Sequence, residues 1–351
     1  MEIGNGIVNV AVDIACTQAA LGHDVAFFSS GGEYEGLLEK HGVRHHLIKF
    51  SKSPLALPGT LWRFRKLIKA ERPCIVHAHM MSPAIVGYLG QVFARYALIT
   101  HVHNEFQRSA RIMGVGDRVI AVSQSVMDSM SRRGISSQKL ALVRNGTIGT
   151  PRRRKEADES TASLKRPSVV TIAGLYARKG IADLLRAFEA LPKDSSAHLY
   201  IVGDGPDRGI FRELAESCSS RDRIHFEGFQ RDPHAYVKAT DIFVLASHRE
   251  PFGLVLAEAR EGGCAIIASR VDGIPEALDD GQAGLLFPPG DVPALTGAML
   301  RLLEDTEFRR GLAKRASENV AWLTVSRMTR EVLEIYEASV KTKRSSRGTS
   351  V

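Results

Sequence analysis

The chain has 351 residues, of which 44% are hydrophobic and 25% charged, a composition typical of a soluble globular protein long enough for two domains. Its four cysteines are scattered without paired spacing, so the sequence predicts neither a zinc site nor a disulfide framework, and reduced thiols favour the cytoplasm. No apolar run reaches the length of a membrane-spanning helix, and the N-terminus lacks the basic start and apolar stretch of a signal peptide.

The net charge of +8 is compatible with three kinds of partner: nucleic acid, an anionic membrane surface or a phosphorylated substrate. Much of the excess lies in two segments that we expect to be disordered, residues 152–155 and the basic tail 341–351. Nucleic acid is the least favoured partner, because no nucleic-acid-binding motif accompanies either segment and no aromatic residues are interleaved with the basic ones.

The N-terminus opens with the turn Gly4-Asn5-Gly6, followed directly by apolar residues at helical spacing. A glycine-rich turn at the start of a helix indicates a loop that approaches a phosphate or a substrate when a strand precedes it. Only residues 1–3 stand where that strand would be. The first strand of a doubly wound sheet usually lies in its middle, so we hypothesise that the reading frame begins upstream and supplies the missing strand.

From residue 24 to residue 149, short β-rich runs alternate with helical segments, which predicts a parallel sheet covered by helices on both faces. The predicted strands are 25–29, 44–50, 74–78, 97–100, 118–122 and 140–144. Residues 60–72 form a basic helix that carries Trp62, Phe64 and Ile68. Two interpretations of it stay open: an amphipathic surface for an anionic membrane or, as we favour, a helix that packs its apolar stripe on the sheet.

Four histidines form two H-x-H pairs near the ends of predicted strands, His77 with His79 and His101 with His103. Strand residues two apart share a face, so each pair could supply metal ligands. No carboxylate or cysteine completes a recognisable ligand spacing, however, and strand ends line the ligand crevice of doubly wound folds in any case. The sequence therefore predicts no metal site.

Residues 150–167 combine proline, four consecutive basic residues and a Ser/Thr/Glu mixture, which predicts an interdomain linker. A predicted strand at 168–173 follows, and Arg178 and Lys179 stand just beyond its end, where such cations are ready phosphate ligands. An Arg-Lys pair taken alone is more often part of a solvated surface. Further strands are predicted at 198–202, 224–227, 241–245, 265–268 and 284–287, before a helical segment at 294–336.

The segment SHREPFGLVLAEARE places two carboxylates, Glu250 and Glu258, eight residues apart across a Pro-Phe-Gly turn that leads into a buried helix. The backbone N–H groups of Phe252, Gly253 and Leu254 would point out of the helix start, where they favour an anion such as a diphosphate. The carboxylates are suited to accept hydrogen bonds from sugar or ribose hydroxyls beside that anion. Taken alone, the pair is as readily explained without a function, with Glu250 as a charge on a surface loop and Glu258 as a solvated helix residue.

The chain resembles the family 4 glycosyltransferases (glycosyltransferase group 1), retaining enzymes of the GT-B fold with an E-x7-E signature. The resemblance is carried by EPFGLVLAEA, Lys179-Gly180, the G-D-G-P turn at 203–206, the H-F-E-G-F strand end at 225–229 and the G-I-P-E turn at 273–276. It covers nearly the whole chain from Gly4.

The resemblance implies a role for each part of the E-x7-E segment. In the family the second glutamate holds the nucleotide ribose, the first contacts hydroxyls of the donor sugar, and the amides between them hold the diphosphate. Those roles fall to Glu258, Glu250 and the amides of residues 252–254.

The resemblance also implies roles outside that segment. Lys179 would bind the diphosphate, and Arg178 would stand in for a family arginine whose aligned position is Gly174. The backbone at Gly203 and at Gly228-Phe229 would read the nucleotide base.

In the N-terminal half, LITHVHNEF places at His103 the family histidine that lies near the sugar C6 hydroxyl and the reaction centre, and His79 matches a second common histidine. The Gly4-Asn5-Gly6 turn matches a family loop for the acceptor or a phosphate, which in the family follows a buried strand.

We therefore expect an α/β protein of the GT-B class, with two Rossmann-like, doubly wound domains facing a cleft and with its first strand missing. The expected bounds are 1–149 for an acceptor-side domain, 150–167 for the linker, 168–324 for a nucleotide-sugar domain, 325–340 for a helix crossing back and 341–351 for the disordered tail.

The implied reaction moves a sugar, with retention, from a UDP- or GDP-sugar to a hydroxyl acceptor in cell-surface polysaccharide or glycolipid synthesis, with Glu250 and His103 at the reaction centre. No D-x-D motif is present, so the sequence requires no metal or other cofactor. Lipid-linked and saccharide acceptors are both compatible, and the basic surface favours an enzyme peripheral to the cytoplasmic leaflet of the membrane. The alternative is an inactive nucleotide-sugar-binding remnant that lacks the first strand.

Overall fold

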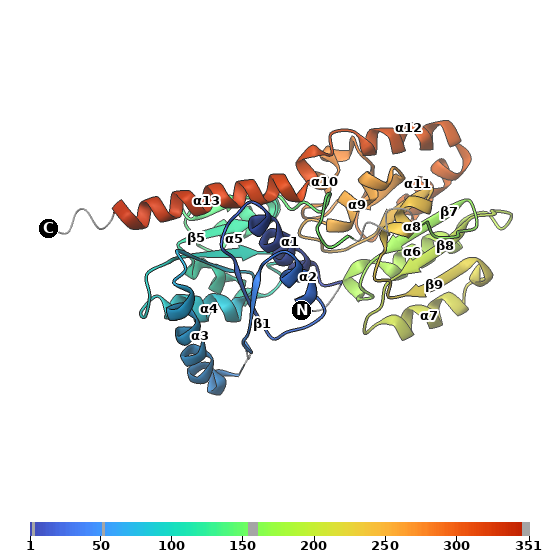
Figure 1. Ribbon diagram of the computed structural model, residues 1–351. Helices are drawn as coiled ribbons and strands as arrows, with labels where there is room; N and C mark the ends of the chain where they lie inside the picture. The colour runs from blue at the N-terminus through green and yellow to red at the C-terminus, as the bar shows by residue number, and fades with distance from the viewer. Residues whose placement is uncertain (2–3, 51–52, 154–160, 346–351) are drawn as a thin grey trace. The chain divides into compact units, whose positions relative to one another are not determined.

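The computed structural model describes residues 1, 4–50, 53–153 and 161–345, and the chain divides into two compact units (Figure 1). Unit 1 is formed by Met1–Arg152 together with the C-terminal stretch from Leu323, and unit 2 is Arg153–Trp322. In the described part of the chain, no helix is both long enough and apolar enough to cross a membrane.

Unit 1 alternates strands and helices, as the sequence predicts. Its strands are β1 (Ala26–Ser29), β2 (Arg44–Leu47), β3 (Ile75–Ala78), β4 (Ala97–Val102), β5 (Arg118–Ala121) and β6 (Leu140–Leu142). Its helices are α1 (Gly6–Ala20), α2 (Glu35–Lys40), α3 (Leu57–Glu71), α4 (Met81–Gly90), α5 (Gln124–Arg132) and α13 (Val325–Ser345). All six residues of β4 are buried, so this strand forms the centre of the unit.

The strands of unit 1 form two parallel sheets. One contains β1 and β2, and the other has the order β3-β4-β5-β6. Within the described residues β1 pairs only with β2 and β3 only with β4, so each has one edge without a strand partner. The strand expected before Gly4 stays a prediction, and Glu2 and Ile3 lie outside the described residues.

Helix α3 packs an apolar stripe into unit 1, as favoured from its sequence. Phe64 and Ile68 are buried, and the Phe64 ring meets the ring of Phe28 from β1 edge to face, with centroids 6.0 Å apart. Trp62, however, is 64% exposed and does not belong to the stripe. Residues two apart in a helix point to different sides of it, so Trp62 cannot share the buried side of Phe64.

The expectation of disorder was wrong for Arg152 and Arg153, and for the first residues of the tail. Arg152 donates two hydrogen bonds to the buried carboxylate of Asp13, at 2.8 and 3.0 Å. Arg153 pairs with Glu261 in unit 2. Each arginine is held in place by a carboxylate that is distant in the sequence. Counting charges along the chain therefore cannot predict that these arginines are ordered. Residues 154–155 lie outside the described residues.

The C-terminal helix extends beyond its predicted end at 340. Helix α13 runs to Ser345, and Lys343 forms an ion pair with Asp117 at 3.0 Å. The basic residues expected to make this end disordered thus include one with an acidic partner elsewhere in unit 1. Residues 346–351 lie outside the described part of the chain.

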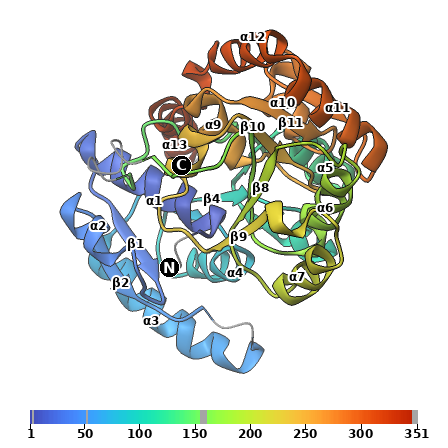
Figure 2. The ribbon, with the colours of Figure 1, turned by 90° about the vertical axis from the view of Figure 1, so that its right-hand side faces the viewer.

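Unit 2 contains one parallel six-stranded sheet with the order β12-β11-β10-β7-β8-β9 (Figure 2). Its strands are β7 (Ser168–Ile172), β8 (His198–Val202), β9 (Ile224–Gly228), β10 (Ile242–Leu245), β11 (Ala265–Ser269) and β12 (Leu285–Phe287). Its helices are α6 (Ile181–Glu189), α7 (Arg208–Glu216), α8 (His234–Ala239), α9 (Leu254–Gly262), α10 (Ile274–Ala277), α11 (Val292–Glu304) and α12 (Thr306–Ser317).

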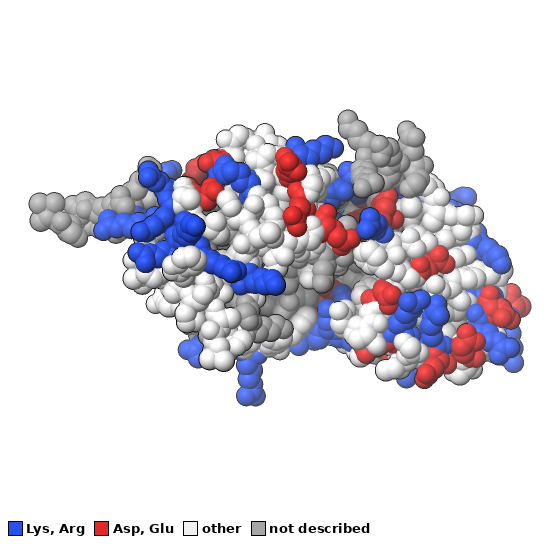
Figure 3. All heavy atoms as spheres, turned by 60° about the horizontal axis from the view of Figure 1, so that its bottom comes forward, with Lys and Arg blue, Asp and Glu red and all other residues white. Residues whose placement is uncertain are grey.

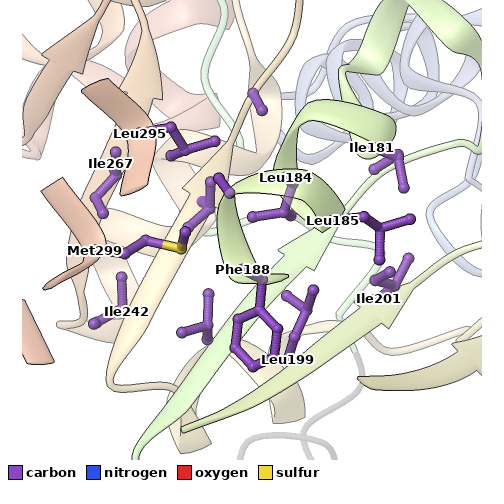
Figure 4. Close-up of a cluster of buried hydrophobic side chains, with 14 of the residues drawn as sticks. Ile181, Leu184, Leu185, Phe188, Leu199, Ile201, Ile242, Ile267, Leu295 and Met299 are labelled. Carbon is purple, nitrogen blue, oxygen red and sulfur yellow. The ribbon is translucent and has the colours of Figure 1, made fainter. Parts of the chain in front are cut away.

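The core of unit 2 follows the alternation of side chains along its strands. Val169 packs in the large cluster that contains Phe188 of α6 and Met299 of α11, both labelled in Figure 4. Its neighbour Val170 packs with Tyr200 in a second cluster. Successive strand residues point to opposite faces, so both faces of β7 are buried.

Candidate functional site

The candidate site of unit 2 lies at the carboxyl ends of two adjacent parallel strands, β7 and β10. The chain proceeds from β7 to β8 and β9 on one side, while β10, β11 and β12 lie on the other, so the strand order reverses between β7 and β10. Ligands of open α/β sheets bind at such a reversal, outside the carboxyl ends of the strands. The loop after β7 carries Lys179 and the loop after β10 carries Glu250, so the fold brings these two predicted residues together.

Gly180 allows these two loops to approach each other. It has φ = +66° at the N-cap of α6, and a Cβ added there would lie 1.9 Å from the carbonyl oxygen of Ala246, just after β10. The His248 N–H donates to the Arg178 carbonyl at 2.8 Å, which joins the loops a second time. Only glycine fits this contact, because both the positive φ and the missing side chain are required.

Lys179 and Glu250 form an ion pair in which Lys179 Nζ donates to Glu250 Oε2. Their side chains are only 15% and 12% exposed, so solvent screens the pair weakly. Ser247 Oγ lies 3.4 Å from the same carboxylate oxygen. The pair presents an ammonium group suited to phosphate oxygens and a carboxylate suited to hydroxyls at one place.

Asp272 positions the backbone of Glu250, a role that the sequence analysis missed. Its Oδ2 accepts from the Glu250 N–H at 2.9 Å and from Arg249 Nε at 2.9 Å. The Gly273 N–H donates to the Glu250 carbonyl at 3.1 Å, and a Cβ on Gly273 would lie 2.1 Å from the Pro251 carbonyl oxygen. The Asp-Gly pair before Ile-Pro-Glu is a sequence signal for a tight turn. It does not reveal that Asp272 binds Glu250, which lies 22 residues earlier in the chain.

The predicted helix after the Pro-Phe-Gly turn is confirmed as α9. It starts at Leu254, with Gly253 as its N-cap at φ = +83°, and no side chain among the described residues caps it. Phe252 is buried and meets the Trp322 ring edge to face, with centroids 6.1 Å apart. Glu258 is half-buried one turn into α9. The first N–H groups of the helix therefore lack a side-chain acceptor, which is the condition for anion binding.

A fully buried arginine, which was not predicted from the sequence, anchors the other end of α9. Arg260 donates from Nε to the Ala316 carbonyl and from Nη1 to the Ala277 carbonyl, both at 2.9 Å. Its Nη2 donates to Asp279 and to the Glu318 carbonyl. All the partners lie in unit 2, and because a buried charge is tolerated only when it is paired, they fix where α9 can lie.

The predicted base-reading glycines lie side by side at the ends of β8 and β9. The Gly203 N–H donates to the Gly228 carbonyl at 2.8 Å. Gly203 has φ = +136°, and a Cβ there would lie 2.0 Å from the Ala173 carbonyl oxygen. Phe229 follows with 47% of its surface exposed, which leaves an aromatic face available for stacking.

The second predicted diphosphate cation, Arg178, lies differently from Lys179. It is exposed, and its guanidinium carbon lies 5.6 Å from the centre of the Tyr176 ring. A Cβ on Gly174 would meet the same ring at 2.8 Å. Tyr176 thus takes up the space next to the position where the family has an arginine, and Arg178 lies over its ring.

The Gly4-Asn5-Gly6 turn of unit 1 opens a helix as predicted. Asn5 is the N-cap of α1, and its Oδ1 accepts from the N–H groups of Ile7 and Val8 at 3.1 and 3.4 Å. Gly4 has φ = +89° and is exposed. Because Asn5 itself satisfies donors of the helix start, the role of this turn toward an acceptor or a phosphate stays a prediction.

The two H-x-H pairs of unit 1 come together at the ends of β3 and β4. The rings of His101 and His103 lie 4.3 Å apart, those of His77 and His79 4.2 Å apart, and His79 Nδ1 lies 2.9 Å from His103 Nε2. Burial, reinforced by the neighbouring imidazole of His79, holds the pKa of His103 well below its usual range. His103 is therefore a neutral imidazole at physiological pH, able to accept or donate a hydrogen bond. The two predicted reaction-centre residues lie in different units, His103 in unit 1 and Glu250 in unit 2.

The chain matches two known sequence families, one in each half. Residues 152–319 match the family described as Glycosyl transferases group 1, and residues 4–147 match Glycosyltransferase Family 4. The matched ranges include Glu250 and Lys179 in the first family and His103 in the second.

Individual relatives align over most of the chain. The N-acetyl-alpha-D-glucosaminyl L-malate synthase of Bacillus anthracis is 26% identical over 348 residues, 90% of this chain and 89% of the relative. The alpha-D-kanosaminyltransferase of Streptomyces kanamyceticus is 30% identical over 293 residues, 73% and 75% of the two chains. The structure of Anabaena Alr3699/HepE in complex with UDP-glucose matches with a TM-score of 0.80 at 20% identity, covering 95% of this chain and 96% of that chain. The expected GT-B fold class is confirmed.

Replacing Gly180 by alanine is expected to destabilise unit 2 by more than 2 kcal/mol. The new Cβ would overlap the Ala246 carbonyl oxygen, and the left-handed backbone adds about 1–2 kcal/mol. Urea denaturation measures the loss. The matched control is Gly209→Ala in α7, where an added Cβ meets nothing within 4 Å. This substitution should stabilise the helix slightly, because alanine has a higher helix propensity than glycine. Equal stability of the two variants would contradict this account of Gly180.

Proposed function

Because this chain belongs to the group 1, family 4 glycosyltransferases, we propose that it transfers a sugar from a nucleotide diphosphate sugar to a hydroxyl group of an acceptor. The observation that carries the proposal is the Lys179–Glu250 pair, placed where the strand order reverses and joined in sequence to the uncapped start of α9. An ammonium group, free helix amides and a carboxylate are the groups that a sugar diphosphate needs at one site.

Each part of the donor has matching residues in unit 2. The diphosphate would bind Lys179 and the amides of residues 252–254, with Arg178 as a further cation. Glu258, one turn into α9, would accept hydrogen bonds from the ribose hydroxyls. The base would lie at the ends of β8 and β9, against Gly203, Gly228 and the exposed ring of Phe229. The UDP-glucose bound by Anabaena Alr3699/HepE supports a donor of this class, and GDP-sugars are equally compatible.

Donor binding would redistribute the charge of the ion pair. Lys179 would share its ammonium protons with the diphosphate, and Glu250 would gain freedom to accept from sugar hydroxyls and to stabilise positive charge at the anomeric carbon. As the bond between that carbon and the phosphate oxygen breaks, Lys179 and the helix amides would meet the negative charge on the leaving diphosphate. A donor phosphate oxygen would take the acceptor proton, and the sugar would keep its anomeric configuration. This scheme requires no metal ion.

His103 of unit 1 would contact the donor sugar at its C6 hydroxyl. A neutral imidazole suits that role, because it can accept the hydroxyl proton or donate to the oxygen without adding charge. The acceptor, a lipid-linked or soluble saccharide, would bind on the side of unit 1 and would lead to cell-surface polysaccharide or glycolipid.

The basic surface of α3 supports an acceptor located at a membrane. Figure 3 shows Lys and Arg side chains gathered on the left of the face that it draws. In α3 itself Arg65, Lys66 and Lys69 are exposed, together with Trp62. Exposed basic residues beside an aromatic ring favour attachment to the anionic cytoplasmic leaflet.

Titration with UDP, GDP and ADP by calorimetry should show one preferred nucleotide, which Glu258→Ala binds at least tenfold more weakly. The variant loses hydrogen bonds from the ribose to a charged acceptor, which are worth about 1.5–3 kcal/mol. Glu216→Ala, which removes an exposed carboxylate from α7, is the control and should bind as the wild type does.

Two outcomes would oppose the proposal. If none of the three nucleotides binds to the folded protein, or if Glu258→Ala binds as tightly as the wild type, the donor site is misplaced. Tight nucleotide binding without sugar transfer would favour an inactive nucleotide-sugar-binding protein.

The protein is expected to sediment with vesicles containing phosphatidylglycerol at low salt, and Lys66→Glu with Lys69→Glu should weaken this binding at least tenfold. Each basic residue near an anionic surface is worth about 1 kcal/mol. The matched control reverses two exposed basic residues of α12, Lys314→Glu with Arg315→Glu. Sedimentation equal to that with neutral vesicles would remove the membrane from the proposal.

A further inference from the structure

Three histidines of unit 1, of which His101 is fully buried, have ligand nitrogens close enough for one metal ion. The ligand atoms of His77, His79 and His101 all lie within 4.8 Å of one another, at the ends of β3 and β4. A tetrahedral ion bonds imidazole nitrogens at about 2.0–2.1 Å, which places them roughly 3.4 Å apart. The rings would have to turn about their side-chain bonds to close that difference.

Several nitrogens of this group have no hydrogen-bond partner. Within the described residues, both ring nitrogens of the fully buried His101 are unpaired, and so is His77 Nε2. An unsatisfied buried polar atom costs about 1–3 kcal/mol, and such atoms are rare in native proteins. Three of them within one cluster therefore indicate a bound group that supplies the missing interactions.

The outer nitrogens of two of these rings are already held. His77 Nδ1 lies 2.6 Å from the Tyr336 hydroxyl of α13, and His79 Nδ1 lies 2.9 Å from His103 Nε2. Histidines that bind a metal usually have this arrangement, in which a partner on one nitrogen fixes the ring and directs the other nitrogen to the ion. The partners thus leave Nε2 of both residues for a ligand.

We propose that His77, His79 and His101 bind one divalent transition-metal ion of the Zn²⁺ type, with Tyr336 and His103 as the outer partners that orient two of the rings. Three imidazoles leave the fourth position of a tetrahedral ion open, and an oxygen of water or of an acceptor group would take it. The site belongs entirely to unit 1 and goes beyond the proposed transfer reaction. From the sequence no metal site was predicted, because no carboxylate or cysteine completes a recognisable ligand spacing around the two H-x-H pairs.

The test uses the full chain without a histidine tag, treated with a chelator and then passed through a desalting column. Titration with Zn²⁺ should show one ion per chain by calorimetry and by elemental analysis, and Co²⁺ should give the visible absorption of a tetrahedral site. His101→Ala and His77→Ala should each weaken Zn²⁺ binding at least tenfold. Zn²⁺ should also raise the Tm of the wild type and not of these variants.

The matched control is His198→Ala, which disrupts another stacked histidine pair, His198 with His225 in unit 2, whose rings lie 5.2 Å apart. This variant should keep the full Zn²⁺ stoichiometry. If His101→Ala does not fold, as judged by circular dichroism, His79→Gln keeps most of the side-chain volume and serves in its place.

Less than one ion per chain at saturating Zn²⁺, or equal affinity in the wild type and the histidine variants, would overturn the proposal. Nucleotide binding gives a separate readout. Unit 2 should bind its nucleotide equally well with and without Zn²⁺, so failure of the donor site and failure of the metal site can be told apart.

Discussion

The candidate donor site depends on how closely the loop after β7 approaches the end of β10. Gly180 permits this contact, because any side chain there would overlap the Ala246 carbonyl. Lys179 immediately precedes it, and the approach lets that ammonium reach Glu250 on the facing loop. A parallel sheet whose order reverses at β7 leaves room at this edge for a ligand, and the glycine contact decides which side chains point into that room.

The rest of unit 2 holds this arrangement rigid. Asp272 fixes the backbone of Glu250, and the buried guanidinium of Arg260 ties the far end of α9 to its neighbours. The start of α9 is thereby held with its amides free of side-chain caps. Preorganised donors of this kind stabilise developing charge without having to reorient during the reaction, which is the main electrostatic requirement for expelling a diphosphate.

Unit 1 places a different chemistry at the ends of its strands. Four imidazoles lie together there, all neutral because burial opposes their protonation, and the unpaired nitrogens of His101 point to a bound group. Unit 2 thus presents paired opposite charges, whereas unit 1 presents neutral donors and acceptors. This difference fits a division in which one unit binds a charged nucleotide donor and the other binds a polar acceptor.

The sequence by itself determined the alternation of strands and helices, the helix that starts after Pro-Phe-Gly, and the Gly4-Asn5-Gly6 turn that opens a helix, because these follow from periodicity and turn chemistry within a few residues. The tertiary structure alone decided the pairing of Lys179 with Glu250, the anchoring of Arg260, the ion pairs of Arg152 and Lys343, and the meeting of the histidines. These contacts join residues between 17 and 226 positions apart, and no local pattern specifies which distant partner a side chain will meet once the strands are ordered in the sheets.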